Sequence, residues 1–180
     1  MAPPSRRWEG ATLSNDAIER IGIGTDLHRL AGGGPLRLGG VDVPFEHHLM
    51  GHSDADVVLH AVADAILGAA GLPDIGEQFP DTDPRYKGCD SRALLAAVVQ
   101  KAASAGLAAA NLDIVIHAER PKLSPYKAAI RDCIAALVGL PPEMIGVKAK
   151  TNEGLDAVGR GEAIACTCVV GLRRLPIGGS

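Results

Sequence analysis

Segments with helical and strand-like patterns alternate along most of this chain, and their order is the feature that most constrains its fold. Three segments repeat apolar residues at helical spacing and predict helices: residues 57–70, 91–105 and 125–138. Four shorter apolar segments predict strands: one that begins at Arg20, and residues 112–118, 144–149 and 163–172. Such an order is typical of a mixed sheet of four or slightly more strands with helices packed on it. The turn at residues 150–162 would join the last two strands directly.

Turn and capping residues mark where the predicted elements begin and end. Ser53 or Asp54 is expected to cap the first helix, because both side chains accept backbone hydrogen bonds at helix starts. Apolar residues on either side of Gly39 and Gly40 predict a short hairpin. Residues 74–90 are rich in Gly, Pro and Asp and too long for a tight turn, so they predict a polar loop of the kind that often carries function.

Composition excludes several classes of protein. The chain has 180 residues, of which 47% are hydrophobic and 22% charged, as in one compact domain. Its net charge of -3 gives no general attraction for nucleic acid or an anionic membrane. No apolar run approaches the ~20 residues of a membrane helix. We expect a disordered extension over residues 1–19, a single domain over residues 20–173 and a tail over residues 174–180.

The cysteines point to a reducing compartment. Cys89, Cys133, Cys166 and Cys168 form no CxxC motif, and their spacing matches neither a zinc knuckle nor a disulfide framework. Cys166 and Cys168 would share one face of a strand as small buried side chains. The first 20 residues contain no apolar core of a signal peptide. We therefore expect reduced thiols and a cytoplasmic protein.

Two histidines and an aspartate have the types and spacing of metal ligands. Asp26 and His28 lie two residues apart, so their side chains share one face of the predicted strand. His60 interrupts the apolar helix, and Asp64 lies one turn later on the same face. A buried hydrogen bond between His60 and Asp64 is the simpler interpretation of that pair alone. Taken with Asp26 and His28, His60 is instead expected to bind a metal, with Asp64 orienting its ring.

A metal held by Asp26, His28 and His60 would keep one coordination position free. Zinc is the first choice, because it binds nitrogen and oxygen ligands in tetrahedral geometry without redox chemistry. Three protein ligands then leave the fourth position open for chemistry on a bound molecule.

Several polar segments are candidate anion-binding sites. His52 stands at the mouth of the first helix, where free amides and the positive end of the helix dipole favour a phosphate. A solvated His52 beside a capping Ser53 or Asp54 is equally consistent with this segment. Three further segments are either ordinary turns or substrate contacts: residues 74–83, 119–124 and 148–153. The last is the most suggestive, because lysines there flank a hydroxyl that can orient a phosphoryl group.

Six segments of the chain match one family in order and spacing. They are residues 24–28, 51–64, 74–76, 79–83, 121–122 and 148–153. Together they closely resemble the 2-C-methyl-D-erythritol 2,4-cyclodiphosphate synthase family, over a range from Arg20 to Arg173. The resemblance implies that residues 20–173 form a catalytic α+β subunit. It also implies a homotrimer with each active site between neighbouring subunits.

The same resemblance implies a reaction and a role for each matching residue. The substrate would be 4-diphosphocytidyl-2-C-methyl-D-erythritol 2-phosphate, a cytidine diphosphate compound that is cyclised with release of CMP. The implied zinc ligands are Asp26, His28 and His60, and the implied ligand of a second cation, Mg²⁺ or Mn²⁺, is Glu153. His52 and Thr151 match the catalytic residues that orient the phosphates. The positions that match substrate contacts are Asp26, His28, His52, Ser53, Asp74, Gly76, Phe79, Asp81, Asp83, Ala118, Pro121, Lys122, Leu123, Ser124, Lys150, Thr151, Glu153 and Arg160.

The chain departs from the family pattern in its last motif. Lys150 and Asn152 stand where many members have threonine. Asp156 replaces a glycine, and Ala157 stands where many members have a phenylalanine. These departures concern the contacts expected from residues 150–157.

Two other functions fit some of the same residues. A zinc-dependent phosphohydrolase would use Asp26, His28 and His60 with a metal-bound water as nucleophile, and it would give a linear product. A non-catalytic trimeric binding module would keep His60 and Asp64 only as a buried pair. It would bind no stoichiometric metal, and a change of His28 to alanine would affect only its stability.

Overall fold

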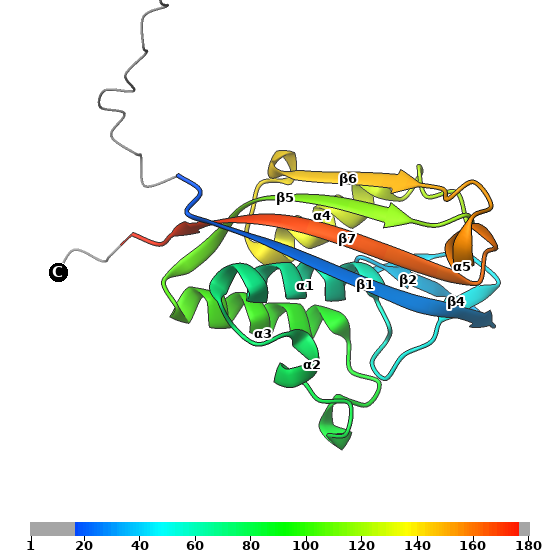
Figure 1. Cartoon of the computed structure of the whole chain (residues 1–180), viewed down its shortest axis with the longest axis horizontal. Coiled ribbons are helices and arrows are strands. Elements are labelled where there is room, and N and C mark those ends of the chain that lie inside the picture. Colours follow the sequence, from blue (N-terminus) through cyan, green and yellow to red (C-terminus); the bar gives the residue numbers. More distant parts are fainter. Residues whose placement is uncertain (1–16, 177–180) are drawn as a thin grey trace, which may run out of the picture.

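A five-stranded mixed sheet forms the centre of the structure, a computed structural model that describes residues 17–176 (Figure 1). The strands follow the order β4-β1-β7-β5-β6, and every neighbouring pair is antiparallel except β5 and β6. Their bounds are Arg20–Gly32 (β1), His47–Leu49 (β4), Leu107–His117 (β5), Ile145–Lys150 (β6) and Ala163–Arg174 (β7). The predicted extension (residues 1–19) and tail (residues 174–180) lie outside the described residues, apart from residues 17–19 and 174–176.

Three helices lie on one side of this sheet (Figure 1). They are α1 (Val57–Ala70), α3 (Ser91–Ser104) and α4 (Lys127–Val138), close to the predicted bounds. The shorter elements are β2 (Leu36–Leu38) and β3 (Val41–Val43), which form the predicted hairpin, α2 (Ile75–Gln78), α5 (Asp156–Gly159) and the 3-10 turns η1 (Pro84–Tyr86) and η2 (Pro142–Met144). Within residues 17–176, none of the helices combines the length and the apolar composition needed to cross a membrane.

Two features of the sheet go beyond the prediction. The turn at residues 150–162 joins β6 to β7, as expected, but these two strands are not neighbours, because β5 lies between them. The chain passes from β5 through α4 to β6, and such a helical crossover makes the two strands parallel. His47 and His48 begin β4 and pair with the end of β1.

Two glycines of β1 bring α1 unusually close to the sheet. A Cβ atom on Gly22 would lie 2.1 Å from the carbonyl oxygen of Ala65, and one on Gly24 would lie 2.1 Å from that of Ala61. Glycine is therefore required at both positions, because any side chain would push the helix away. Since His60 precedes Ala61, this close approach holds His60 against the middle of β1, which carries Asp26.

The cap of α1 is Asp56, and the prediction of Ser53 or Asp54 is wrong. The fully buried Asp56 carboxylate accepts the amides of Val58 and Leu59, both at 3.1 Å. It also accepts the amides of Gly39 at 2.8 Å and Gly40 at 2.6 Å, in the turn of the β2–β3 hairpin. Asp56 therefore ties the hairpin to α1, a link that no local capping pattern encodes.

The opposite face of the sheet carries exposed apolar side chains. Along β1, inward and outward residues alternate, and Ile21, Ile23 and Leu27 point outward with 73%, 65% and 58% of their surface exposed. Val169 of β7 is also exposed. In the part of the chain that the structure describes, no helix covers this apolar face.

The prediction of reduced, buried thiols agrees with the structure. All four cysteines are free, and Cys166 and Cys168 are buried on the inner face of β7. Burial raises the pKa of the Cys166 thiol well above its ordinary value and that of Cys168 to about 12. Both thiols therefore stay protonated and have no reactive thiolate at neutral pH.

Candidate active site

Asp26, His28 and His60 form a group with the geometry of a metal site. One ligand atom from each lies within 4.8 Å of the others. Asp26 Oδ2 is 2.9 Å from His28 Nε2 and 3.0 Å from His60 Nδ1, and the two ring nitrogens are 3.4 Å apart. Ligands of a tetrahedral metal ion at ~2.1 Å would lie about 3.4 Å from one another. The three residues therefore form the candidate metal site that the sequence predicts, with a spacing that suits a tetrahedral ion.

Hydrogen bonding and charge prepare His28 for this role. His28 Nδ1 lies 2.8 Å from the carbonyl oxygen of Met50, to which it donates, so Nε2 is the nitrogen that faces Asp26 and would bind a metal. The hydrogen bond with Asp26 raises the pKa of His28, although burial opposes the shift. Burial alone would raise the pKa of Asp26, but hydrogen bonds with His28 and His60 hold it well below its ordinary value. Asp26 is therefore a carboxylate that attracts cations.

Asp64 does not bond to His60, so both predicted roles for that pair are wrong. The Asp64 carboxylate accepts the backbone amide of Ile75 at 2.8 Å and anchors the first residue of α2. A spacing of four residues places two side chains on one helix face but leaves their rotamers free. Here the Asp64 carboxylate instead accepts a hydrogen bond from the backbone amide of Ile75, in a neighbouring segment of the chain.

Sequence reasoning missed Ser91, one of the two residues that contact the second nitrogen of His60. Ser91 Oγ, from the first turn of α3, lies 2.9 Å from His60 Nε2, and Ser53 Oγ lies 3.1 Å from the same atom. Ser91 is 31 residues away from His60 in the chain. No local spacing signal joins them, and only the packing of α3 against α1 brings them together.

A pocket opens beside the triad and collects several predicted site residues. Its volume is about 270 Å³, and it is lined by His28, His52, Ser53, His60, Ile75, Gly76, Phe79, Asp81, Tyr86 and Leu94. The polar loop of residues 74–90 supplies about half of this lining, including the predicted Gly76, Phe79 and Asp81. The Phe79 and Tyr86 rings meet edge to face at 5.4 Å, which holds two parts of that loop together. The loop therefore shapes a binding site.

Two predicted substrate contacts have structural roles in this loop. Asp74 accepts the amide of Glu77 at 2.9 Å and begins α2. Asp83 accepts the amide of Arg85 at 3.0 Å and forms an ion pair with its guanidinium. Both carboxylates thus complete turns, which is the ordinary alternative that the sequence offered for this segment.

A second group of predicted residues lies at the other edge of the sheet. It comprises Ala118, Pro121, Lys122, Leu123, Ser124, Lys150, Thr151, Glu153 and Arg160, which follow β5 and β6 or lie near α5. Strand register places Asp26 in line with Ala149 of β6, with β7 and β5 between them. Three strand spacings separate the two groups by roughly 14 Å. One chain therefore does not bring Thr151 to the triad.

Two of the four departures from the family motif, Asn152 and Asp156, are hydrogen-bonded to each other near Thr151. Asn152 donates to the Asp156 carboxylate at 2.9 Å and lies 3.2 Å from His117 Nδ1. Asp156 also accepts the amides of Val158 at 2.8 Å and Gly159 at 3.2 Å. These bonds fix the turn that presents Thr151 and Glu153, both exposed to solvent.

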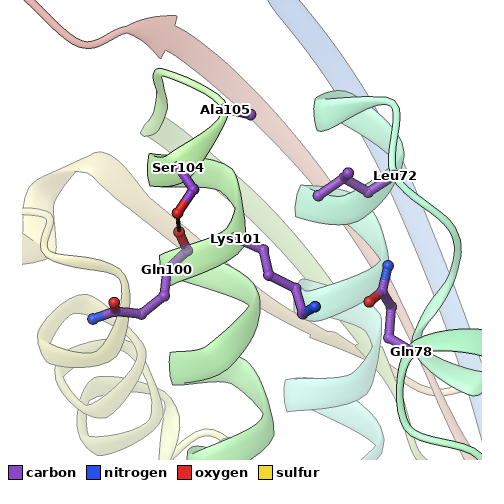
Figure 2. Close-up of a pocket in the computed structure, with 6 residues that line it drawn as sticks. All are labelled: Leu72, Gln78, Gln100, Lys101, Ser104 and Ala105. Carbon is purple, nitrogen blue, oxygen red and sulfur yellow. Dashed lines mark hydrogen bonds between the residues drawn. The ribbon is translucent and has the colours of Figure 1, made fainter.

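Another hollow, of about 420 Å³, lies between α3 and the segment that follows α1 (Figure 2). Its lining residues are Leu72, Gln78, Gln100, Lys101, Ser104 and Ala105. This set contains one charged side chain and no histidine, carboxylate or thiol. This hollow therefore contains none of the predicted site residues.

Comparisons with known proteins agree with this site. A model described as the YgbB family matches residues 19–173. The 2-C-methyl-D-erythritol 2,4-cyclodiphosphate synthase of Bordetella petrii is 54% identical over 155 residues, which cover 86% of this chain and 96% of that relative.

Comparisons with solved structures agree with the sequence comparisons. Bifunctional IspDF from Campylobacter jejuni superposes with a TM-score of 0.84 at 41% identity, over 87% of this chain and 42% of that longer one. A CDP-bound 2C-methyl-D-erythritol-2,4-cyclodiphosphate synthase gives a TM-score of 0.79 at 40% identity, over 85% of this chain and 99% of that one. By sequence and by fold, this chain belongs to the YgbB family, together with the 2-C-methyl-D-erythritol 2,4-cyclodiphosphate synthases.

Proposed function

We propose that this protein converts 4-diphosphocytidyl-2-C-methyl-D-erythritol 2-phosphate to 2-C-methyl-D-erythritol 2,4-cyclodiphosphate and CMP, as a phosphorus–oxygen lyase of non-mevalonate isoprenoid precursor synthesis. The observation that carries the proposal is the triad of Asp26, His28 and His60, which opens into a pocket of about 270 Å³. Family membership supports the choice of substrate.

The reaction depends on positioning of the phosphates and neutralisation of their charge more than on a strong base. An oxygen of the 2-phosphate attacks the β-phosphorus, and the bond from β-phosphorus to the bridging oxygen breaks, so that its electron pair leaves with CMP. A phosphate monoester has a second pKa of about 6, so this nucleophile is already ionised at neutral pH. Asp26, His28 and His60 would hold zinc and Glu153 a second cation, Mg²⁺ or Mn²⁺, and these ions supply polarisation and charge neutralisation of the diphosphate.

The chain's own residues would place the two ends of the substrate. His52, Ser53, Gly76, Phe79 and Asp81 border or line the pocket beside the triad and would hold the methylerythritol phosphate. The group around Pro121 to Ser124, with Lys150, would contact the cytidine. His52 and Thr151 would orient the phosphates between these ends, where the ring closes.

The separation of these two groups supports a homotrimer with active sites between subunits. Roughly 14 Å lies between the triad and Thr151 within one chain, so a neighbour must bring its own Thr151 to this triad. The uncovered apolar face of Ile21, Ile23 and Leu27 supplies a surface for that contact. A cytoplasmic location is part of the proposal, and the free thiols support it.

Phosphorus NMR of the purified protein with this substrate and magnesium tests the function. We expect signals of a cyclic diphosphate and of CMP, which disappear after zinc is chelated and return when zinc is restored. A linear phosphate product would replace the cyclase with a hydrolase. Unchanged substrate with zinc present would leave only a binding module.

A further inference from the structure

Ser91 lies between the metal ligand His60 and a carboxylate. Its side chain is 1% exposed, and its Oγ atom is 2.9 Å from His60 Nε2. Asp54 contacts the same hydroxyl through Oδ1 and accepts the Ser91 backbone amide through Oδ2 at 3.2 Å. One buried hydroxyl therefore bridges an imidazole nitrogen and a carboxylate that lie on different segments of the chain.

The direction of these hydrogen bonds follows from the number of protons. A carboxylate only accepts hydrogen bonds, and a hydroxyl has one proton to donate. Ser91 must give this proton to Asp54, because otherwise two acceptor oxygens would face each other in close contact. The Arg37 guanidinium lies 3.6 Å from Asp54 Oδ2 and forms an ion pair with this carboxylate. Ser91 Oγ is then an acceptor toward His60, so His60 Nε2 must carry a hydrogen.

We propose that Ser91 and Asp54 are positioning residues that, when zinc is bound, hold His60 as its Nε2–H tautomer and so direct the Nδ1 lone pair to the metal. Nδ1 is the nitrogen that lies 3.0 Å from Asp26 Oδ2. The other tautomer would put a hydrogen where the ion must bind. This inference rests on the metal site of the proposed function.

Ser53 alone does not fix the tautomer of His60. Its Oγ is 3.1 Å from His60 Nε2 and accepts the amide of Ala55, also at 3.1 Å. Unlike Ser91, it has no carboxylate to take its proton, so it can either donate to His60 or accept from it. The Asp54–Ser91 pair therefore decides the tautomer.

Zinc affinity, measured by competition with a chromophoric chelator, tests this assignment without an activity assay. We expect Ser91→Ala to raise the zinc Kd roughly 10- to 100-fold, as for other residues that orient a metal-bound histidine. Asp54→Asn should also weaken zinc binding, because an amide cannot accept from both donors of Ser91. Ser91→Thr keeps the hydroxyl and should restore near wild-type affinity.

The matched control is Ser104→Ala, at the other end of α3. Its hydroxyl bonds only to the carbonyl oxygen of Gln100, so the zinc Kd should not change. A zinc Kd for folded Ser91→Ala equal to that of the wild type would overturn the proposal.

A measurement on the unaltered chain covers the case in which a variant does not fold. Long-range nitrogen–proton NMR of the zinc-loaded protein should show the His60 hydrogen on Nε2 and the metal-bound nitrogen as Nδ1. Zinc bound through Nε2 of His60 would overturn the assignment. If the tautomer and the affinities are as expected but no cyclic product forms, the proposed function fails while the role of Ser91 and Asp54 stands.

Discussion

Gly24 sets the distance between His60 and Asp26. A Cβ atom there would lie 2.1 Å from the carbonyl oxygen of Ala61, so Gly24→Ala should push α1 away from β1. We expect a loss of about 1–3 kcal/mol in the free energy of unfolding, as for other overpacked sites, together with weaker zinc binding. Urea denaturation and zinc titration measure the two effects. Gly68→Ala is the control, since the nearest atom to its Cβ would be 3.9 Å away, and a stable, zinc-binding Gly24→Ala would contradict this account.

Because the pKa of His28 is raised, the stabilisation that zinc binding gives to the fold should depend on pH. The hydrogen bond with Asp26 raises this pKa above the ordinary 6.5 in the metal-free protein. Protonated His28 therefore stabilises the metal-free fold fully below pH 6.5, and this contribution is lost as the pH rises through the raised value. Zinc needs the neutral ring, so its own stabilisation grows over the same range.

We therefore expect the Tm difference between zinc-loaded and metal-free protein to widen from about pH 5.5 to about pH 8. Differential scanning calorimetry at matched ionic strength measures both forms. In His28→Gln, which has no titrating ring at this position, the stability of the metal-free form should lose this part of its pH dependence. A Tm difference that stays constant over the range would show that His28 is not a zinc ligand.

At the scale of the elements, Asp56 joins α1 to the β2–β3 hairpin through four backbone amides. Asp56→Ala would leave the buried amides of Gly39 and Gly40 without acceptors and would also remove the helix cap. We expect a loss of at least about 3 kcal/mol in the free energy of unfolding, which chemical denaturation can measure.

Asp90→Ala is the matched control for this cap. Asp90 caps α3 through the amide of Arg92 at 2.9 Å, at the surface, so its removal should cost only about 1 kcal/mol. Equal losses of unfolding free energy in the two variants would mean that the link between Asp56 and the hairpin contributes nothing to stability.

The elements that the sequence predicts correctly are those with local signals. The apolar repeat of α1 and the turn of Gly39 and Gly40 are properties of neighbouring residues, and both elements form as expected. The place of β5 between β6 and β7 depends on a crossover that no short pattern records. The same limit explains the site: Asp26 and His28 are paired by spacing, whereas Ser91 reaches His60 only through the packing of two helices.

At the scale of the whole molecule, the proposed function implies that a single chain is an incomplete catalyst. The triad and Thr151 lie roughly 14 Å apart across three strand spacings. The face with Ile21 and Ile23 is apolar and uncovered in one chain. Both observations have the same explanation if three chains associate through this face and each completes the site of its neighbour.

Mixed trimers of two inactive variants test this arrangement. His60→Ala should lose zinc and activity together, whereas Thr151→Ala should keep zinc and lose activity. The two chains are produced together with different affinity tags, and mixed trimers are purified on both tags. One site in each mixed trimer then pairs an intact triad with an intact Thr151. The mixed trimers should therefore recover roughly a third of the wild-type activity. Inactive mixed trimers would show that the triad and Thr151 of different subunits do not share a site, because an arrangement within one chain leaves every site damaged.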